Sequence, residues 1–143
     1  MKGLRGFAIL SAIFILVVLA ALGAFMLSVS SSQQIGSALD VQGVRAYQAA
    51  RAGIEWGLYR QLQSSSCAAT SSFTLGGSTF TGVVVTVTCN ASTPSVTGEP
   101  VVYTLQSTAC NQPLSGWSAT SAACPNTSSP GSFYIERRLS VTF

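Results

Sequence analysis

Residues 7–29 read FAILSAIFILVVLAALGAFMLSV, an apolar run that only Ser11, Gly23 and Ser28 interrupt. At a rise of about 1.5 Å per residue, a helix of this length spans about 35 Å, more than the ~30 Å hydrocarbon core of a bilayer. No charged residue follows the start of the run until Asp40. The run therefore predicts a helix that can cross a membrane.

Positive charge precedes the apolar run at Lys2 and Arg5. The positive-inside rule then places the N-terminus in the cytoplasm and the rest of the chain across the membrane. A cleaved secretory signal peptide and an uncleaved signal anchor are the two alternatives. The apolar core of a secretory signal is about 7–15 residues long and is cut on its far side. Here the run is longer, and Gly6 followed by Phe7 offers a cleavage site before it.

The helix is expected to continue beyond the membrane to about Gln61, because no proline occurs before Pro94. Small residues recur there at steps of three and four, which places them on one helical face. Small side chains let another backbone approach closely, so we expect a sheet to lie against this face. A frayed, glycine-rich linker is the alternative, which the i,i+4 pair of Arg51 and Glu55 disfavours. The small-residue stripe comprises Gly43, Ala46, Ala50, Gly53 and Gly57, flanked by Val44, Tyr47, Ile54 and Leu58.

The period of the pattern changes from 3.6 to 2 after Cys67, where β-branched and aromatic residues alternate with polar ones. Strands are predicted over residues 73–75, 79–88, 100–108 and 132–143, with Gly76 and Gly77 as a tight turn between the first two. The predicted fold class is therefore α+β, with a long N-terminal helix packed on a small antiparallel sheet.

All of the cysteines lie beyond the apolar run. An even number in a small exported domain indicates two disulfides, and zinc fits less well because the chain has no C-x-x-C pair and no histidine. A bond between the last two would close a loop around Trp117, and one between the first two would tie the helix exit to the end of the second strand. Three pairings remain open among Cys67, Cys89, Cys110 and Cys124.

Composition argues against several classes of protein. Charged residues make up 8% of the chain, against about 25% in soluble domains, which disfavours a cytosolic globule. The net charge is +3, and it falls to +1 when Lys2 and Arg5 are left out, so no basic face is expected and nucleic-acid binding is not indicated. With no histidine and four acidic residues spread along the chain, we expect no enzyme, no catalytic residue, no cofactor and no metal site.

Two features could be read as functional, but each also has a simpler structural explanation. Glu136 stands beside Arg137 and Arg138, but alternation along a strand separates neighbours, so a solvated edge is expected. Trp117, with Leu114, is the place where we would look for contact with a partner, but we favour the simpler interpretation that the tryptophan side chain only covers the sheet.

The N-terminal residues MKGLRGFAILSAIFILVVL resemble a class III signal, the signal of type IV prepilins. The resemblance extends to VQGVRAYQAARAGIEWGLYRQLQ, TVTC at residues 86–89, QSTAC at 106–110 and the terminal YIERRLSVTF. This combination is similar to the MshP-type minor pilins of the mannose-sensitive haemagglutinin (MSHA) pilus, and more distantly to PilX-type minor pilins.

The resemblance implies that a prepilin peptidase cuts after Gly6 and that Phe7 becomes the methylated N-terminus. It divides the chain into a leader (1–6), a transmembrane and filament-core helix (7–29), an exposed continuation of that helix (30–63) and a disulfide-bonded, β-rich head (64–143). The implied location is the bacterial inner membrane with a periplasmic head, and then the pilus at the cell surface. The implied partners are membrane lipid before assembly, the peptidase, the inner-membrane assembly platform, and other major and minor pilins.

Ser11 departs from the family pattern. Most pilins carry glutamate as the fifth residue of the mature chain, and counting from Phe7 places Ser11 there. A carboxylate buried among apolar helices is costly unless it is paired. The resemblance implies that in the family this glutamate neutralises the N-terminal amine of a neighbouring subunit. We therefore expect a position at the filament tip; the alternative is that Ser11 is simply a neutral position in a membrane helix.

The leading functional expectation is a minor pilin-like structural subunit that acts in pilus assembly. The alternatives are a minor pseudopilin of type II secretion, an adhesin or DNA-uptake binding module, and an uncleaved single-pass membrane protein of another role.

Overall fold

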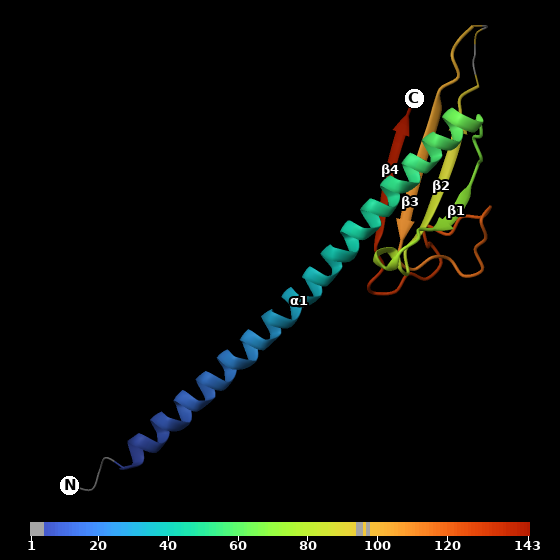
Figure 1. Cartoon of the computed structure of the whole chain (residues 1–143). Helices are drawn as coiled ribbons and strands as arrows, with labels where there is room; N and C mark the ends of the chain where they lie inside the picture. The colour runs from blue at the N-terminus through green and yellow to red at the C-terminus, as the bar shows by residue number, and fades with distance from the viewer. Residues whose placement is uncertain (1–4, 94–95, 97) are drawn as a thin grey trace. The chain divides into compact units, whose positions relative to one another are not determined.

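A computed structural model describes residues 5–93, 96 and 98–143 of the 143-residue chain. The chain divides into two compact units, Met1–Ala38 and Leu39–Phe143. One helix contributes residues to both units, and all the strands belong to the second (Figure 1). In chain order the elements are α1 (Arg5–Ser64), β1 (Ser71–Thr74), the 3-10 helix η1 (Ser78–Phe80), β2 (Val84–Ala91), β3 (Tyr103–Cys110) and β4 (Glu136–Thr142).

Helix α1 begins two residues before the predicted start and ends at Ser64, slightly beyond the predicted end at Gln61. The helix stops because Ser65 takes a left-handed backbone conformation, with φ of 48°. The Ser66 N–H then donates to the Arg60 carbonyl oxygen at 3.2 Å, which satisfies one of the carbonyls left open at a helix C-terminus.

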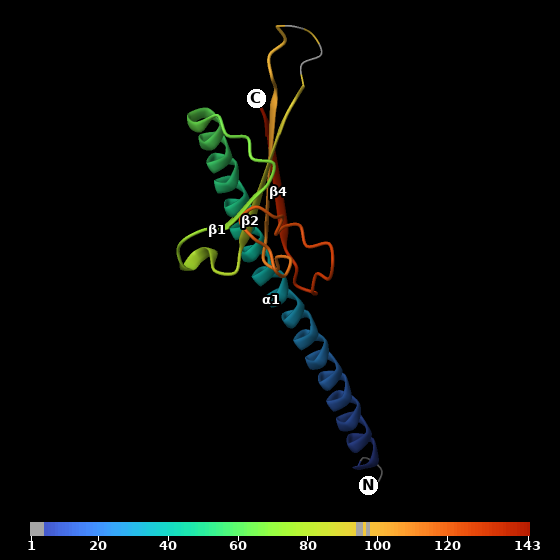
Figure 2. The same cartoon turned by 90° about the vertical axis from the view of Figure 1, so that its right-hand side faces the viewer.

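The four strands form one antiparallel sheet in the order β1-β2-β3-β4, so each strand pairs with its neighbours in the sequence. The register places Phe73 opposite Val85, Thr88 opposite Gln106, and Gln106 opposite Ser140. Strands β1 and β4 lie at the two edges of the sheet (Figure 2).

The predicted boundaries of the strands were wrong at several ends. The tight turn at Gly76 and Gly77 is replaced by a longer connection that contains η1, because Gly77 and Gly82 both take positive φ and divert the chain. The strand expected from residue 79 therefore starts at Val84, and it continues to Ala91.

The last two strands also begin later than predicted. Strand β3 begins at Tyr103 rather than residue 100. Strand β4 begins at Glu136 rather than residue 132, because a turn bond from the Tyr134 N–H to the Gly131 carbonyl bends the chain just before it.

The head buries two layers of side chains, one on each face of the sheet. One face packs on α1, and residues 111–135 cover part of the opposite face with a smaller cluster. The first cluster has Ala49, Ala50, Val83, Val85, Val87, Cys89, Leu105 and Ala109 at its centre; the second has Val84, Cys110, Ala123 and Cys124.

The predicted fold class is confirmed. One long N-terminal helix packs on a small four-stranded antiparallel sheet, which is an α+β, pilin-like architecture.

Candidate functional site

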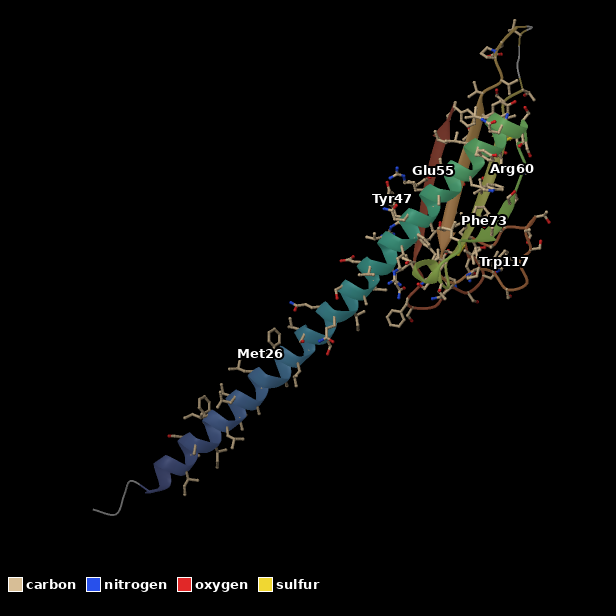
Figure 3. The ribbon with its side chains drawn as sticks, viewed as in Figure 1. Met26, Tyr47, Glu55, Arg60, Phe73 and Trp117 are labelled. Atoms are coloured by element: carbon tan, nitrogen blue, oxygen red, sulfur yellow. A yellow bond between two sulfur atoms is a disulfide. The ribbon has the colours of Figure 1, made fainter. Side chains whose placement is uncertain are left out.

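The first unit of the chain presents an apolar stretch of α1 whose side chains are uncovered. Large apolar side chains are exposed on all sides of the helix, including Phe14 at 69%, Met26 at 70% and Leu27 at 72% relative exposure. Side chains around Met26 project from α1 in different directions (Figure 3). The helix is long and apolar enough to cross a membrane, judged by length and composition. A helix that is apolar all round is stable only in lipid or among other apolar helices.

The residues predicted to be processed lie at the start of this helix. Gly6 and Phe7 fall within α1, while residues 1–4 of the predicted leader lie outside the described residues. Ser11 is partly covered and lies on α1 next to Leu10, within the apolar stretch.

The small-residue stripe faces the sheet. All five members are buried, and Ala49 is buried beside them. Two of the expected flanking residues, Ile54 and Leu58, pack against the core, whereas Val44 and Tyr47 remain 60% and 44% exposed. The stripe is therefore the contact face of α1 with the sheet.

Of the glycines in α1, Gly53 leaves the least room between the helix and the sheet. A Cβ added there would collide with Ser107 Oγ and would lie 2.7 Å from Val85 Cγ1 and 3.1 Å from Val87 Cγ2. One turn later, a Cβ at Gly57 would lie 3.2 Å from Leu105 Cδ1. The close approach of the sheet therefore requires glycine at both positions. This packing offsets the cost of glycine inside a helix, which is up to about 1 kcal/mol relative to alanine.

Two disulfides hold the head. Cys67 is bonded to Cys89, which ties the exit of α1 to β2, and Cys110 is bonded to Cys124, which closes the loop that follows β3. In the chain-entropy model, closing a loop of about 15 residues stabilises the folded state by about 3 kcal/mol. No cysteine is free among the described residues.

A buried hydroxyl network fastens this loop to the sheet. Thr86 Oγ1 accepts hydrogen bonds from the backbone N–H groups of Ala123 at 3.0 Å and Cys124 at 2.9 Å. Ser72 Oγ donates to the Ser121 carbonyl oxygen at 2.6 Å, so the 2.9 Å bond between the two hydroxyls must use the proton of Thr86. One threonine therefore serves as acceptor twice and donor once.

The loop carries a surface hollow beside Trp117. The tryptophan is half-buried and packs against the small cluster around Cys110 and Cys124, so it covers the sheet as the simpler interpretation expected. Its loop also lines a hollow of about 430 Å³, together with Leu114, Ser121 and Asn126.

Charges at the base of β4 pair along the strand. Arg138 Nη2 lies 3.1 Å from Glu136 Oε1, while Arg137, one residue away, lies on the opposite face next to Gly43. The Tyr134 hydroxyl donates to Glu136 Oε2 at 2.8 Å and accepts from the Asn126 N–H at 2.9 Å. Burial, and secondarily the hydrogen bond to Glu136, raise the pKa of Tyr134 above its ordinary value.

Comparison with known proteins identifies no relative of this chain. No protein-family model, curated protein or solved structure matches the chain. Within residues 5–93, 96 and 98–143, no group of three or more histidine, cysteine or acidic side chains is placed to hold a metal ion.

Sequence reasoning located the apolar segment, the stripe and the cysteines but missed the Thr86 network. Its members come from β1, β2 and the closed loop, and no local pattern links residues so far apart in the sequence. A buried threonine in the middle of an otherwise valine-rich strand was the available signal.

Proposed function

We propose that this chain is a minor pilin-like structural subunit of a type IV pilus of the MSHA type. The single observation that carries the proposal is the uncovered apolar stretch of α1 on a helix whose other end packs on a small disulfide-bonded sheet. Such a stretch is stable in a bilayer, and it can also pack in a bundle of similar helices. It is thereby suited to a subunit that waits in the membrane and then enters a filament.

The proposed sequence of events takes the helix from the membrane into the filament. The chain is held in the inner membrane as a single span with its head in the periplasm, where the two disulfides are stable. A prepilin peptidase removes residues 1–6, Phe7 is methylated, and the assembly platform moves the subunit from lipid into the filament with other major and minor pilins. The role is structural, without catalysis or a cofactor.

We further propose that the subunit lies at the tip of the filament. Ser11 stands where most pilins carry glutamate, and a hydroxyl cannot neutralise the N-terminal amine of a subunit already in place as a carboxylate can. A tip subunit has no such predecessor, so the loss of the carboxylate carries the least cost there.

Shearing of surface filaments from cells that produce a tagged chain tests this role. The chain is expected in the sheared filament fraction, and immunogold particles are expected at filament ends. A strain without the assembly platform serves as the control and should retain the chain in its membrane fraction. Recovery of the chain only from membranes of normal cells would refute the filament role, and label along the shaft would refute the tip position alone.

A further inference from the structure

The loop closed by Cys110 and Cys124 holds a surface hollow on the face of the sheet opposite α1 (Figure 2). The hollow measures about 430 Å³, which falls in the range of about 300–1,000 Å³ that is usual for small-molecule sites. Residues 113–117 line it from one segment of the chain, and residues 121, 122, 126, 128 and 129 line it from another. The proposed structural role leaves this hollow without a use.

Hydrogen bonds join the two segments that line the hollow. The Leu114 N–H donates to the Ala123 carbonyl oxygen at 2.8 Å. Asn126 Nδ2 donates to the Gln112 carbonyl oxygen at 3.0 Å. The hydroxyl of Thr86 fastens the same loop to the sheet. A ligand that enters the hollow therefore meets a preformed surface, and the cost of ordering the chain on binding is small.

Trp117, labelled in Figure 3, gives the hollow an aromatic wall. Its side chain is half-buried, because it packs on the cluster around Cys110 and Cys124 and also lines the hollow. Pro113 and Leu114 add apolar surface to the same hollow. The indole N–H donates to no group in the described part of the chain. The tryptophan thus offers an apolar surface with an available donor at its edge.

The rest of the lining is polar and uncharged. No residue that lines the hollow carries a charge. The hydroxyl groups of Ser115, Ser128 and Ser129 are exposed and bond to no group among the described residues. Asn126 Oδ1 accepts from the backbone N–H groups of Ser128 and Ser129, at 3.1 and 3.4 Å, so this amide shapes the wall. Three hydroxyls, each able to donate and to accept, therefore line the same hollow as the indole.

We propose that this hollow binds a neutral carbohydrate. The C–H groups on a face of a sugar ring form an apolar surface that can pack on the indole of Trp117, while the ring hydroxyls bond with the free serine hydroxyls. A charged ligand would lose its hydration without gaining a partner of opposite charge, so an anion or a cation fits less well. The inference rests on the head alone and does not depend on the proposed role in a filament.

A peptide is the alternative ligand for a hollow with an aromatic wall. Proline-rich segments dock in grooves that are lined by aromatic side chains. Among the described residues that line this hollow, Trp117 is the only aromatic one, and hydroxyl groups make up most of its polar side chains. This lining matches the many hydroxyls of a sugar better than it matches a run of prolines.

Oligosaccharide binding by the purified full chain tests the proposal. The chain is kept in dodecylphosphocholine micelles, which carry no sugar, and is applied to an array of neutral oligosaccharides of hexose and N-acetylhexosamine units in α and β linkage. Oligosaccharides that bind are then titrated in solution by calorimetry. We expect at least one neutral member to bind with a dissociation constant on the order of 1 mM or lower. Its sialylated or sulfated forms should bind no more tightly.

Substitutions assign the binding to the hollow. Trp117→Ala is expected to weaken binding at least about tenfold, because it removes the aromatic surface. Trp117→Phe keeps an aromatic ring and should weaken binding only about threefold. Ser115→Ala removes one free hydroxyl and should also weaken binding about threefold. Thr120→Ala, on the same loop but outside the hollow, and Tyr59→Ala, an exposed aromatic of α1, are the controls and should leave the affinity unchanged.

Failure of every neutral oligosaccharide to bind would overturn the proposal, as would equal affinities of Trp117→Ala and the unsubstituted chain. Tighter binding of a sialylated or sulfated form, or of a decaproline peptide, would overturn the class of ligand. Amide hydrogen exchange at Ala123 and Cys124 identifies a variant whose loop has opened. Ser115→Ala removes no packed group, so the test holds even if Trp117→Ala opens the loop. In that case, equal affinities of Ser115→Ala and Thr120→Ala would overturn the proposal.

Discussion

Replacing Gly53 by leucine is expected to destabilise the head by about 3 kcal/mol, at the upper end of the usual cost of overpacking. The added Cβ alone would lie 2.7 Å from Val85 Cγ1 and would collide with Ser107 Oγ, so α1 must move away from the sheet to admit it. Leucine is a better helix former than glycine, so the loss must come from packing. Guanidinium unfolding of the full chain in detergent micelles, followed by tryptophan fluorescence, measures the change.

Gly36→Leu is the matched control for this variant. Gly36 lies on the same helix, and a Cβ added there meets nothing within 4 Å. Its free energy of unfolding should be unchanged or higher by up to about 1 kcal/mol, because leucine is the better helix former and meets no neighbour at this position. If both leucine variants unfold at the same denaturant concentration, the small-residue stripe does not pack against the sheet as described.

Thr86→Val is expected to destabilise the head by roughly 3 kcal/mol. Valine matches threonine in shape but offers no oxygen, so the N–H groups of Ala123 and Cys124 lose their acceptor at a site where Thr86 is only 3% exposed. A buried donor without a partner costs about 1–3 kcal/mol. The same unfolding measurement applies, and amide exchange at Ala123 and Cys124 should accelerate.

Thr86→Ser separates the hydroxyl from the methyl group. Serine keeps the oxygen and removes one buried methyl, so a loss of about 1 kcal/mol is expected. The disulfide between Cys110 and Cys124 still closes the loop in either variant, so a larger loss for valine than for serine reports on the hydroxyl. Equal stability of the serine and valine variants would show that the network does not hold the loop.

The parts of the fold that were predictable are those with a local period. The spacing from Gly43 to Gly57 gave the buried face of α1, because helical geometry alone brings those residues to one side. Composition alone gave the apolar stretch, since no packing partner is needed to recognise about 20 consecutive apolar residues. The β-branched residues located the four strands but not their ends.

The parts that were not predictable depend on residues distant in the sequence. Strand β2 begins at Val84, and not at residue 79, because Gly77 and Gly82 adopt positive φ and divert the chain. Glycine permits this conformation but does not require it, so the sequence alone does not predict it. The role of Thr86 emerges only from strand order and register. The pairing of the cysteines was likewise open, because spacing allows three arrangements.

In the proposed role, the apolar helix is released from a short leader and then serves in assembly. Mass spectrometry of the chain isolated from cells tests it most directly, with a Gly6→Val variant as the control that should keep its leader. We predict a mature chain that begins at Phe7 and carries one methyl group on its N-terminal amine. A chain that retains residues 1–6, with its apolar stretch intact in the membrane, would show that the chain is not processed as a prepilin.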